Sequence, residues 1–446
     1  MKLNSIIYRN LGILPLFILF IVFPSKGQNT LTLEQAIKTA LLHNHSILIS
    51  QNANEISENN ATYGNADLLP TVGVNAGYSY SNSEANLTFA GELPPQNGVE
   101  AESQSYNASI GINYVLFDGL GNITTFQKYG KQRDLSTVQT KIAIESTMLQ
   151  VINAFYELVR EEQQLKLLQR TLAISKERYK RNTLNYEYGG GSKIDLLNAQ
   201  VDYYRDSSNV LSSIQNVENA MNNLNFLMGQ PIEHTFNADE SSFSTITFSN
   251  YEELKKEASE NNTNLMLSLV NLELSELDVQ MTKSYFYPKI SMNASYGYNR
   301  SDNTAGILLK NETLGFSGGV SLAWNLFNGN KRNIALQNAK ILLENNDLKK
   351  QEALLSIHKE LKTMYGTHQN NIMIIDLEKE NVSIAQINLD RSEELLENGQ
   401  ISNLDFRQAQ LNLLVSQTRL NNAQYAAKIT EFQLKRLKGD LLSEQN

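Results

Sequence analysis

The stretch Thr71-Val-Gly-Val-Asn-Ala-Gly-Tyr-Ser-Tyr80 opens a segment, residues 71–117, that has a counterpart later in the chain. The counterpart, about 289–327, opens with Lys289-Ile-Ser-Met-Asn-Ala-Ser-Tyr-Gly-Tyr298. In both segments, apolar or aromatic residues alternate with small or polar ones. This period of two is typical of a β-strand with one apolar face. Both segments also end in such a pattern, so each is predicted to be a pair of strands. Polar connections are predicted between the strands, at about 81–105 and about 299–313.

Helical patterns fill the rest of the chain. Long ones at about 119–187 and 331–397 carry leucines at helical core spacing, and each stops at a glycine turn. Returning helices follow at about 192–228 and 402–438. The pattern therefore predicts two helical hairpins, one after each strand pair.

A further helix is predicted before each strand pair. The first, at about 32–69, has Thr32 as its N-cap, and the second lies at 251–287. Pro70 and Pro288 follow them and disfavour a helical conformation in the preceding residue. The predicted mature chain, 28–446, is thus a single unit of two tandem repeats, about 28–229 and 251–439, with a connector at about 230–250.

The helix lengths predict a rod. Each uninterrupted helix spans about 100 Å at 1.5 Å per residue. Two short helices placed end to end match one long helix, and the pairs suggested by length are 193–228 with 251–287 and 402–438 with 32–69. The strands then lie at one end of the rod, the glycine turns at the other, and the connector at mid-height.

The N-terminus and the composition narrow the possible functions. Residues 1–27 have the basic start, short apolar run and small residues of a secretory signal peptide, with cleavage near Gly27–Gln28. The chain has no cysteine, which excludes disulfides and thiolate chemistry. Its formal charge of −9 argues against a nucleic-acid partner, because such partners are bound by neutralising phosphates.

Catalytic patterns are absent from the sequence. His43 and His45 lie two residues apart on a predicted helix and therefore face different directions. No His-Glu-x-x-His, Gly-x-Ser-x-Gly or dinucleotide-binding pattern occurs. Gly189-Gly190-Gly191 is not followed by the Gly-Lys-Ser/Thr of a phosphate-binding loop. We therefore predict no enzyme, no cofactor and no metal site.

Four strands at the end of a rod are too few to close a β-barrel in a membrane. A sheet crosses a membrane only as a closed barrel, and bacterial barrels have at least eight strands. If these strands enter a membrane, several chains must share one barrel. Aromatic residues near the ends of the second strand pair suit a membrane interface: Tyr285, Phe286, Tyr287, Trp324 and Phe327. The other interpretation is a soluble sandwich capped by helices.

The residues resemble those of the outer-membrane efflux protein (TolC) family over the whole mature chain. The similar segments are Leu31-Thr-Leu-Glu-Gln-Ala-Ile37 with Asn44, Leu69-Pro70 and its strand, Phe117-Asp-Gly119, Leu326-Phe-Asn-Gly329 and Gly399-Gln-Ile-Ser-Asn-Leu-Asp405. The resemblance implies an α+β membrane protein in which long antiparallel helices form an α-barrel or coiled coil. Four strands from each chain of a homotrimer would close one twelve-stranded β-barrel in outer-membrane lipid.

The resemblance also implies a function. The chain would be the exit channel of a tripartite efflux or type I secretion system, reaching from the outer membrane into the periplasm. Its partners would be a periplasmic adaptor (membrane fusion protein) and an inner-membrane pump. The sequence leaves open the choice between small-molecule efflux and protein secretion. A different class of function, a trimeric coiled-coil adhesin or structural spoke without transport, would require sustained heptads without strand pairs.

The tip turns contain the candidate functional residues. Both returning helices begin Ser-x-x-Asp, at Ser192–Asp195 and Ser402–Asp405, which favours helix capping and the helix dipole. In a trimer the two aspartates would form a ring of negative charge that selects cations. The resemblance implies that Asp195 and Asp405 line the periplasmic constriction. The turn residues that the family uses for adaptor docking correspond to Gly189, Gly190, Gly191, Ser192, Gly399 and Ser402.

The resemblance further implies that a tyrosine and an arginine near the tip tether the gate. Tyr186 and Tyr188 are the candidate tyrosines, but the second repeat has Leu395 and Leu396 in that region and no matching tyrosine. Arg407 is the candidate arginine, although it follows Asp405 rather than preceding it.

Overall fold

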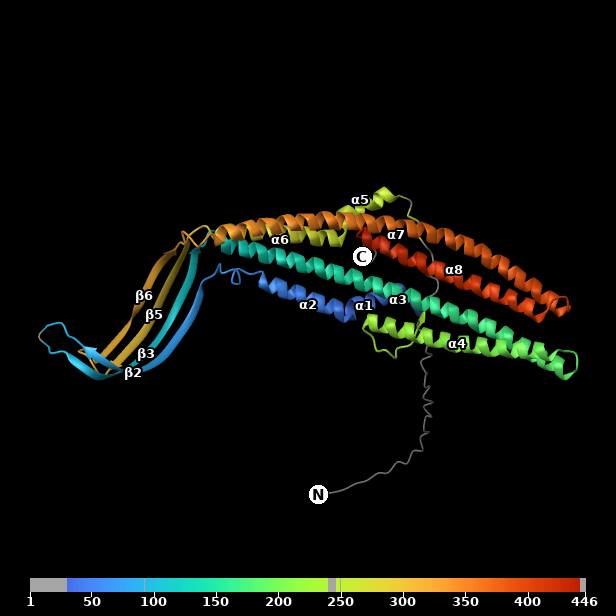
Figure 1. The fold of residues 1–446 in the computed structure, drawn as a ribbon, viewed down its shortest axis with the longest axis horizontal. Coiled ribbons are helices and arrows are strands. Elements are labelled where there is room, and N and C mark those ends of the chain that lie inside the picture. Colours follow the sequence, from blue (N-terminus) through green and yellow to red (C-terminus); the bar gives the residue numbers. More distant parts are fainter. Residues whose placement is uncertain (1–29, 92, 240–245, 249, 442–446) are drawn as a thin grey trace, which may run out of the picture.

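A computed structural model describes residues 30–91, 93–239, 246–248 and 250–441. It is a long bundle of helices with a curved sheet at one end and two helix turns at the other (Figure 1). The predicted fold class, α+β with tandem repeats of long antiparallel helices and strand pairs, is confirmed. The predicted signal peptide and part of the predicted connector lie outside the described residues.

Two helical hairpins form the body of the molecule. The long helices α3 (Gly121–Glu187) and α7 (Lys331–Glu397) have 67 residues each. The returning helices are α4 (Lys193–Met228) and α8 (Asn403–Leu437), which pack along α3 and α7 respectively. Because α3 also contacts α8 and α6, it connects the two repeats.

The predicted helices before the strand pairs are each interrupted by an asparagine. The first consists of α1 (Leu33–His43) and α2 (His45–Asn60), and the second of α5 (Tyr251–Asn261) and α6 (Thr263–Ser284). The Asn44 side chain caps α2 by accepting from the N–H groups of Ser46 and Ile47, and Asn262 caps α6 in the same way. The first helix was also predicted too long, because turns replace it after Asn60. The N-cap predicted at Thr32 is confirmed and forms a capping box.

The predicted end-to-end pairing of the short helices was wrong, because they stack within each repeat. Asn44 Nδ2 donates to the Leu227 carbonyl at 2.8 Å, which joins α1 and α2 to the end of α4. Asn262 Nδ2 donates to the Leu437 carbonyl at 2.9 Å and joins α5 and α6 to α8. Helix length alone could not distinguish the two pairings, whereas the asparagine contacts select one.

The four long strands form one antiparallel sheet in the order β2 (Thr71–Leu87), β3 (Gln96–Phe117), β5 (Lys289–Asn303) and β6 (Lys310–Ala323). The predicted polar connections at about 81–105 and 299–313 are mostly strand. Cross-strand contacts between polar residues continue the ladder there, including Tyr80 with Glu102 and Asn82 with Glu100. Polar residues on both faces give no period-two signal, which is why the sequence pattern ended early.

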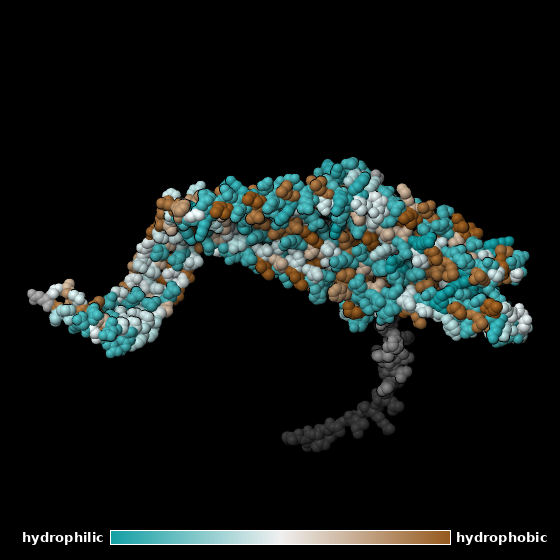
Figure 2. Space-filling view, viewed as in Figure 1, coloured by the Kyte–Doolittle hydropathy of each residue, from teal (hydrophilic) through white to brown (hydrophobic). Residues whose placement is uncertain are grey.

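The sheet has one apolar and one polar face. A single row of aligned residues on one face contains Val74, Ile110, Tyr296 and Phe316, and all four are at least half exposed. The next row, on the other face, contains Asn75, Ser109, Gly297 and Gly315. Figure 2 shows the sheet as mostly pale to teal from one side, with brown apolar residues spread along the helices.

The main hydrophobic core lies at mid-height, around the middle of α3. Phe155 and Tyr156 are fully buried there, against residues from α1, α4 and α8. A two-residue parallel pairing between β1 (Thr30–Leu31) and β4 (Asn237–Ala238) holds the start of the described chain against the connector. None of the helices in the described ranges has the length and hydrophobicity that a membrane span requires.

Candidate functional site

The glycine turns at the tip have the backbone geometry that the sequence predicts. Gly189 has φ +78° and Gly399 has φ +67°, so both adopt the left-handed conformation that ends a helix sharply. Gly190 and Gly191 do not have positive φ. At Gly191 a Cβ atom would lie 3.1 Å from the main chain of Asn185, so close approach within the turn explains the absence of a side chain there.

Ser192 and Ser402 are the N-caps of α4 and α8. Ser192 Oγ accepts from the Ile194 N–H at 3.2 Å. Ser402 Oγ accepts from the Asp405 N–H at 3.2 Å, and the Asp405 carboxylate accepts in return from the Ser402 hydroxyl at 2.7 Å and its N–H at 3.2 Å. These hydrogen bonds, that from the hydroxyl foremost, lower the pKa of the exposed Asp405. Asp405 is therefore a helix cap that stays charged.

Asp195 has a different environment. It lines a small cavity of about 70 Å³ between the two hairpins, together with the first turn of α8 and two arginines. Arg178 and Arg407, both almost fully buried, supply positive charge to this cavity. The structure thus brings together three of the predicted residues, Asp195, Ser402 and Arg407, whereas Asp405 does not line the cavity.

Arg407 forms the centre of a buried ionic cluster. Its guanidinium binds both carboxylate oxygens of Asp206, with Nη2–Oδ1 at 2.7 Å and Nη1–Oδ2 at 2.8 Å. Arg407 Nη1 also donates to Ser175 Oγ at 3.2 Å and to Gln410 Oε1 at 2.8 Å. Because Asp206 is on α4, Ser175 on α3 and Arg407 on α8, the cluster joins the two hairpins.

A second arginine extends the cluster toward the tip. Arg178 of α3 forms an ion pair with Asp202 of α4 and donates to the Asn403 carbonyl of α8 at 3.4 Å. Burial lowers the pKa of the Arg178 guanidinium, against the opposing effect of Asp202. Asp202 lies 3.7 Å from Arg407 Nε, so it lies between the two arginines. The contact of Arg178 with Asn403 gives the hairpins a second connection.

Arg407 is among the candidates selected from the sequence, whereas its partners are not. Asp202 and Asp206 are spaced four residues apart on α4, and Arg178 is on the facing side of α3. Charged residues in this spacing are usual on a helix face that is exposed to solvent. Only burial distinguishes such a face from a buried ionic cluster. The available signal was the i, i+4 pair of aspartates on the helix face that also carries Ala199 and Val210.

The two candidate tyrosines are not part of this cluster. Tyr188 is 86 % exposed and Tyr186 is 42 % exposed. Within the described part of the chain, neither phenol group forms a hydrogen bond. They lie at the tip turn, on the surface.

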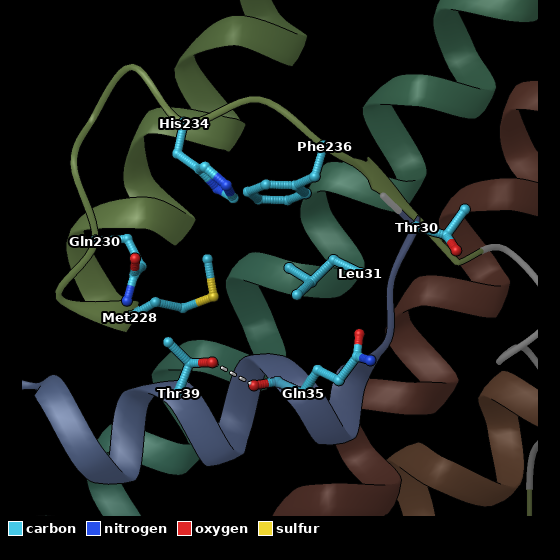
Figure 3. A pocket seen from close by; sticks show the side chains of 8 residues that line it. All are labelled: Thr30, Leu31, Gln35, Thr39, Met228, Gln230, His234 and Phe236. Atoms are coloured by element: carbon cyan, nitrogen blue, oxygen red, sulfur yellow. Dashed lines mark hydrogen bonds between the residues drawn. The ribbon is translucent and has the colours of Figure 1, made fainter. Parts of the chain in front are cut away.

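A second concave site lies at mid-height. A recess of about 420 Å³ is lined by residues of β1, of α1, of the end of α4 and of the connector (Figure 3). His234 and Phe236 lie on one side of it, with ring centres 5.7 Å apart, and Gln35 and Thr39 of α1 lie opposite. None of the described residues that line it is acidic, and none is a lysine or arginine. The recess has no counterpart among the residues selected from the sequence.

Comparison with known families identifies the architecture. The family model described as "Outer membrane efflux protein" matches residues 36–230 and 254–440, so each repeat is matched separately. Among curated proteins, the outer membrane protein TolC of Vibrio cholerae is 21 % identical, over 86 % of this chain and 85 % of that protein. The alkaline protease secretion protein AprF of Pseudomonas aeruginosa is also 21 % identical, over 81 % of this chain and 75 % of its own.

Solved structures share the fold. The Campylobacter jejuni CmeC outer membrane channel aligns with a TM-score of 0.77 and 16 % identity, covering 92 % of this chain and 86 % of that one. The Vibrio cholerae outer membrane protein VceC aligns with a TM-score of 0.73 and 17 % identity, covering 91 % and 96 %. At these identities the alignments establish the arrangement of helices and strands.

Proposed function

Because the chain belongs to the outer membrane efflux protein family, we propose that three copies form one exit channel for a pump in the inner membrane. This is a family of channels rather than of enzymes, and the chain is an outer-membrane protein whose helices extend into the periplasm. A periplasmic adaptor would join the tip to the pump. On export, residues 1–27 would be removed as a signal peptide, leaving a unit of two tandem repeats.

The sheet is the observation that carries the proposal. Its apolar face is exposed in the single chain, and its two edge strands, β2 and β6, have no partner on their outer sides within the described residues. In a membrane, the apolar face would contact lipid. The unpaired edges would find partners if β6 of one copy pairs with β2 of the next. The pairing would be antiparallel because the strands alternate in direction across the sheet. Three copies give twelve strands.

The two faces fit a channel wall. The apolar rows would contact lipid, and the other face, with serine, asparagine and glycine in most rows, would line a wide and weakly selective lumen. An adhesin or spoke would expose the apolar face to water, at a cost of about 25 cal/mol for each Å² of apolar surface left in water.

Exposed apolar stripes on the helices fit contacts between copies. On α4 the stripe contains Leu197, Val201, Tyr204 and Leu211, and on α7 it contains Met373, Leu377, Ile384 and Ile387. In both stripes the successive residues are three, four or seven positions apart, as at the seam of a coiled coil. Because they lie on different hairpins, α4 of one copy would pack against α7 of its neighbour and close a ring of helices.

The tip cluster supports a closable end. In the proposed trimer, Asp195 and Asp405 contribute six carboxylates at the periplasmic constriction. Arg407 and Arg178 hold α8 against α3 and α4, so the channel opens when these contacts separate. The surface around Gly189, Gly190, Gly191 and Gly399 is the proposed docking site for the adaptor.

Light scattering and bilayer recording together test the assembly. The mature protein extracted in mild detergent should have the mass of a trimer, because a single chain leaves both sheet edges open. In a planar bilayer the same sample should give discrete, cation-preferring openings. A stable monomer would contradict the proposal, and a trimer that never conducts would contradict it in favour of the adhesin or spoke.

A further inference from the structure

The joint between the sheet and the helices of the second repeat contains an arginine held in a fixed position. Arg332, in the first turn of α7, donates from Nη1 to the Tyr285 carbonyl at 3.2 Å and from Nη2 to the Leu326 carbonyl at 3.0 Å. Its guanidinium also lies over the Phe286 ring, 5.2 Å from the ring centre. Three segments therefore position this side chain: the end of α6, the connection after β6 and the start of α7.

The positive charges at this joint have no carboxylate partner. Across the described ranges, neither Arg332 nor the neighbouring exposed Lys331 forms an ion pair. The contacts of Arg332 are to main-chain carbonyls and an aromatic face, which leave its full charge uncompensated. A rigid guanidinium with free N–H groups is well suited to the oxygens of a phosphate.

The arginine lies at the rim of the apolar face of the sheet. Trp324, one residue past β6, continues the alternation of Phe316, Val320 and Leu322, and its indole Nε1 donates to the Phe286 carbonyl at 3.2 Å. Trp324 is 55 % exposed and Phe327 is 82 % exposed. Figure 1 shows this joint where β5 and β6 meet α6 and α7. Tryptophan and tyrosine at such a rim are typical of the level of lipid headgroups.

The opposite end of the same face has the opposite charge. Glu84, Glu100 and Glu102 follow the apolar rows there, and Glu100 and Glu102 accept hydrogen bonds from Asn82 and Tyr80 respectively rather than from a cation. The basic residues at that end, Arg300 and Lys310, form ion pairs with Asp302 and Glu312, so the glutamates leave the end negative. A negatively charged headgroup would be repelled at that end and attracted at the Arg332 end. The sheet therefore discriminates between its two rims by charge.

We infer that Arg332 and Lys331 bind the phosphate of an anionic glycerophospholipid, of the phosphatidylglycerol type, in the leaflet that borders the helices. The aromatic residues of the joint contact the glycerol and upper acyl region, and Arg332 binds the phosphate oxygens. Lys331 adds a second charge that favours a net negative headgroup over a zwitterionic one. The inference rests on the proposed function, because it requires the apolar face to lie in lipid.

The chain carries its own reporter for this site, since Trp324 is its single tryptophan. The mature protein is reconstituted in phosphatidylcholine vesicles that contain increasing fractions of phosphatidylglycerol with brominated acyl chains, which quench tryptophan on contact. Brominated phosphatidylcholine gives the reference curve. Contact of the phosphate with one or two basic side chains predicts a preference for phosphatidylglycerol. Brominated phosphatidylglycerol should reach the same quenching of Trp324 at a mole fraction about fivefold lower than brominated phosphatidylcholine.

Three variants make the test specific. Arg332→Gln should remove most of the preference for phosphatidylglycerol, whereas Arg332→Lys, which keeps the charge, should retain part of it. Lys289→Gln is the matched control. Lys289 lies at the same end of the sheet, but in a row with Ala323 on the polar face. It should leave the preference unchanged.

Channel recordings on the same samples distinguish a failure of the lipid site from a failure of the proposed channel function. Normal conductance with equal lipid preference in wild type and Arg332→Gln would overturn the lipid site alone. A wild-type protein that forms no channels would overturn the proposed function and this inference with it. Stronger competition by unlabelled lipopolysaccharide than by unlabelled phosphatidylglycerol would place the phosphate in the other leaflet and would also contradict the inference.

Discussion

At the tip turns, Asp195 and Asp405 occupy equivalent positions in the two repeats but have different surroundings. Asp405 is exposed, and its carboxylate accepts hydrogen bonds from Ser402. Asp195 is half-buried beside a cavity that contains the side chains of two arginines. A helix cap and a charged constriction are compatible roles for Asp405, because capping uses the carboxylate without neutralising it.

Removal of both carboxylates should change ion selectivity. In an Asp195→Ala, Asp405→Ala variant, we expect a weaker preference for cations and weaker block by multivalent cations, because negative charge at the proposed constriction would attract both. Reversal potentials under a salt gradient measure the first effect, and dose–response curves for block measure the second.

The pKa of Asp405 adds a pH dependence to this prediction. Since its pKa is lowered by Ser402, Asp405 stays ionised when the pH falls below the ordinary range of an aspartate. The cation preference of the wild type should therefore persist at that pH. Glu394→Ala, which removes an exposed carboxylate of α7, is the control. Block that is identical in the double variant and the wild type would reduce both aspartates to helix caps.

At the scale of secondary-structure elements, buried polar side chains determine how the helices meet. Asn44 and Asn262 interrupt helices and fix the end-to-end contacts within each repeat. Arg407 and Asp206, both almost fully buried, fix the contact between the hairpins. Such pairs add little net stability but are costly to break singly, so they specify one arrangement of otherwise similar helices.

Arg407→Met should loosen the tip. It leaves the carboxylate of Asp206 buried without its partner, which costs about 3–5 kcal/mol. We expect faster hydrogen exchange in the first turns of α4 and α8, together with a higher open probability in bilayers. Arg391→Gln is the matched control, because its pair with Glu394 is largely exposed and worth about 0–1 kcal/mol.

A second substitution separates stability from tethering. In an Arg407→Met, Asp206→Leu variant both charges are gone, so stability should recover while the connection between the hairpins stays absent. A raised open probability in this variant supports Arg407 as a gate tether. If the open probability returns to the wild-type level together with stability, the role of the pair is structural only.

On the scale of the whole molecule, the sheet and the helices leave complementary surfaces uncovered. The apolar rows of the sheet and the stripes on α4 and α7 all lie on the outside of the single chain. A single chain therefore leaves these surfaces exposed to water, and the proposed assembly in a membrane would cover each of them. In that assembly the charged tip and the polar sheet face would remain in contact with water.

Two neighbouring residues of β6 test which face contacts lipid. Phe316→Lys places a charge on the apolar face and should cost about 2–4 kcal/mol near the bilayer midplane, so that few trimers reach the membrane. Ser317→Lys places the same charge on the polar face, where Ser317 contacts Ser295 at 2.9 Å. This variant should assemble normally and shift selectivity toward anions. Trimer yield from membranes and reversal potential are the readouts, and the opposite pattern would reverse the assignment of the faces.

The amino-acid sequence by itself determined the elements and the repeat. Period-two and helical patterns are local, so they identify the strand pairs, the long helices and the glycine turns without any knowledge of packing. The sequence also singled out Arg407 as a candidate at the tip. It predicted that several chains must share one barrel if the strands enter a membrane, since a count of strands is sufficient for that argument.

Only the tertiary structure decided which helices stack end to end, how far the strands extend, and that Arg407 contacts Asp206 rather than a residue of the turn. Each of these depends on contacts between residues far apart in the chain. The hydrogen bond from Asn44 to Leu227 spans 183 positions, and the ion pair of Arg407 with Asp206 spans 201. In sequence, Arg407 and Asp206 look like residues of a solvent-exposed helix face. The sequence pattern shows only that they are polar, whereas their burial depends on the neighbouring helices that the fold places around them.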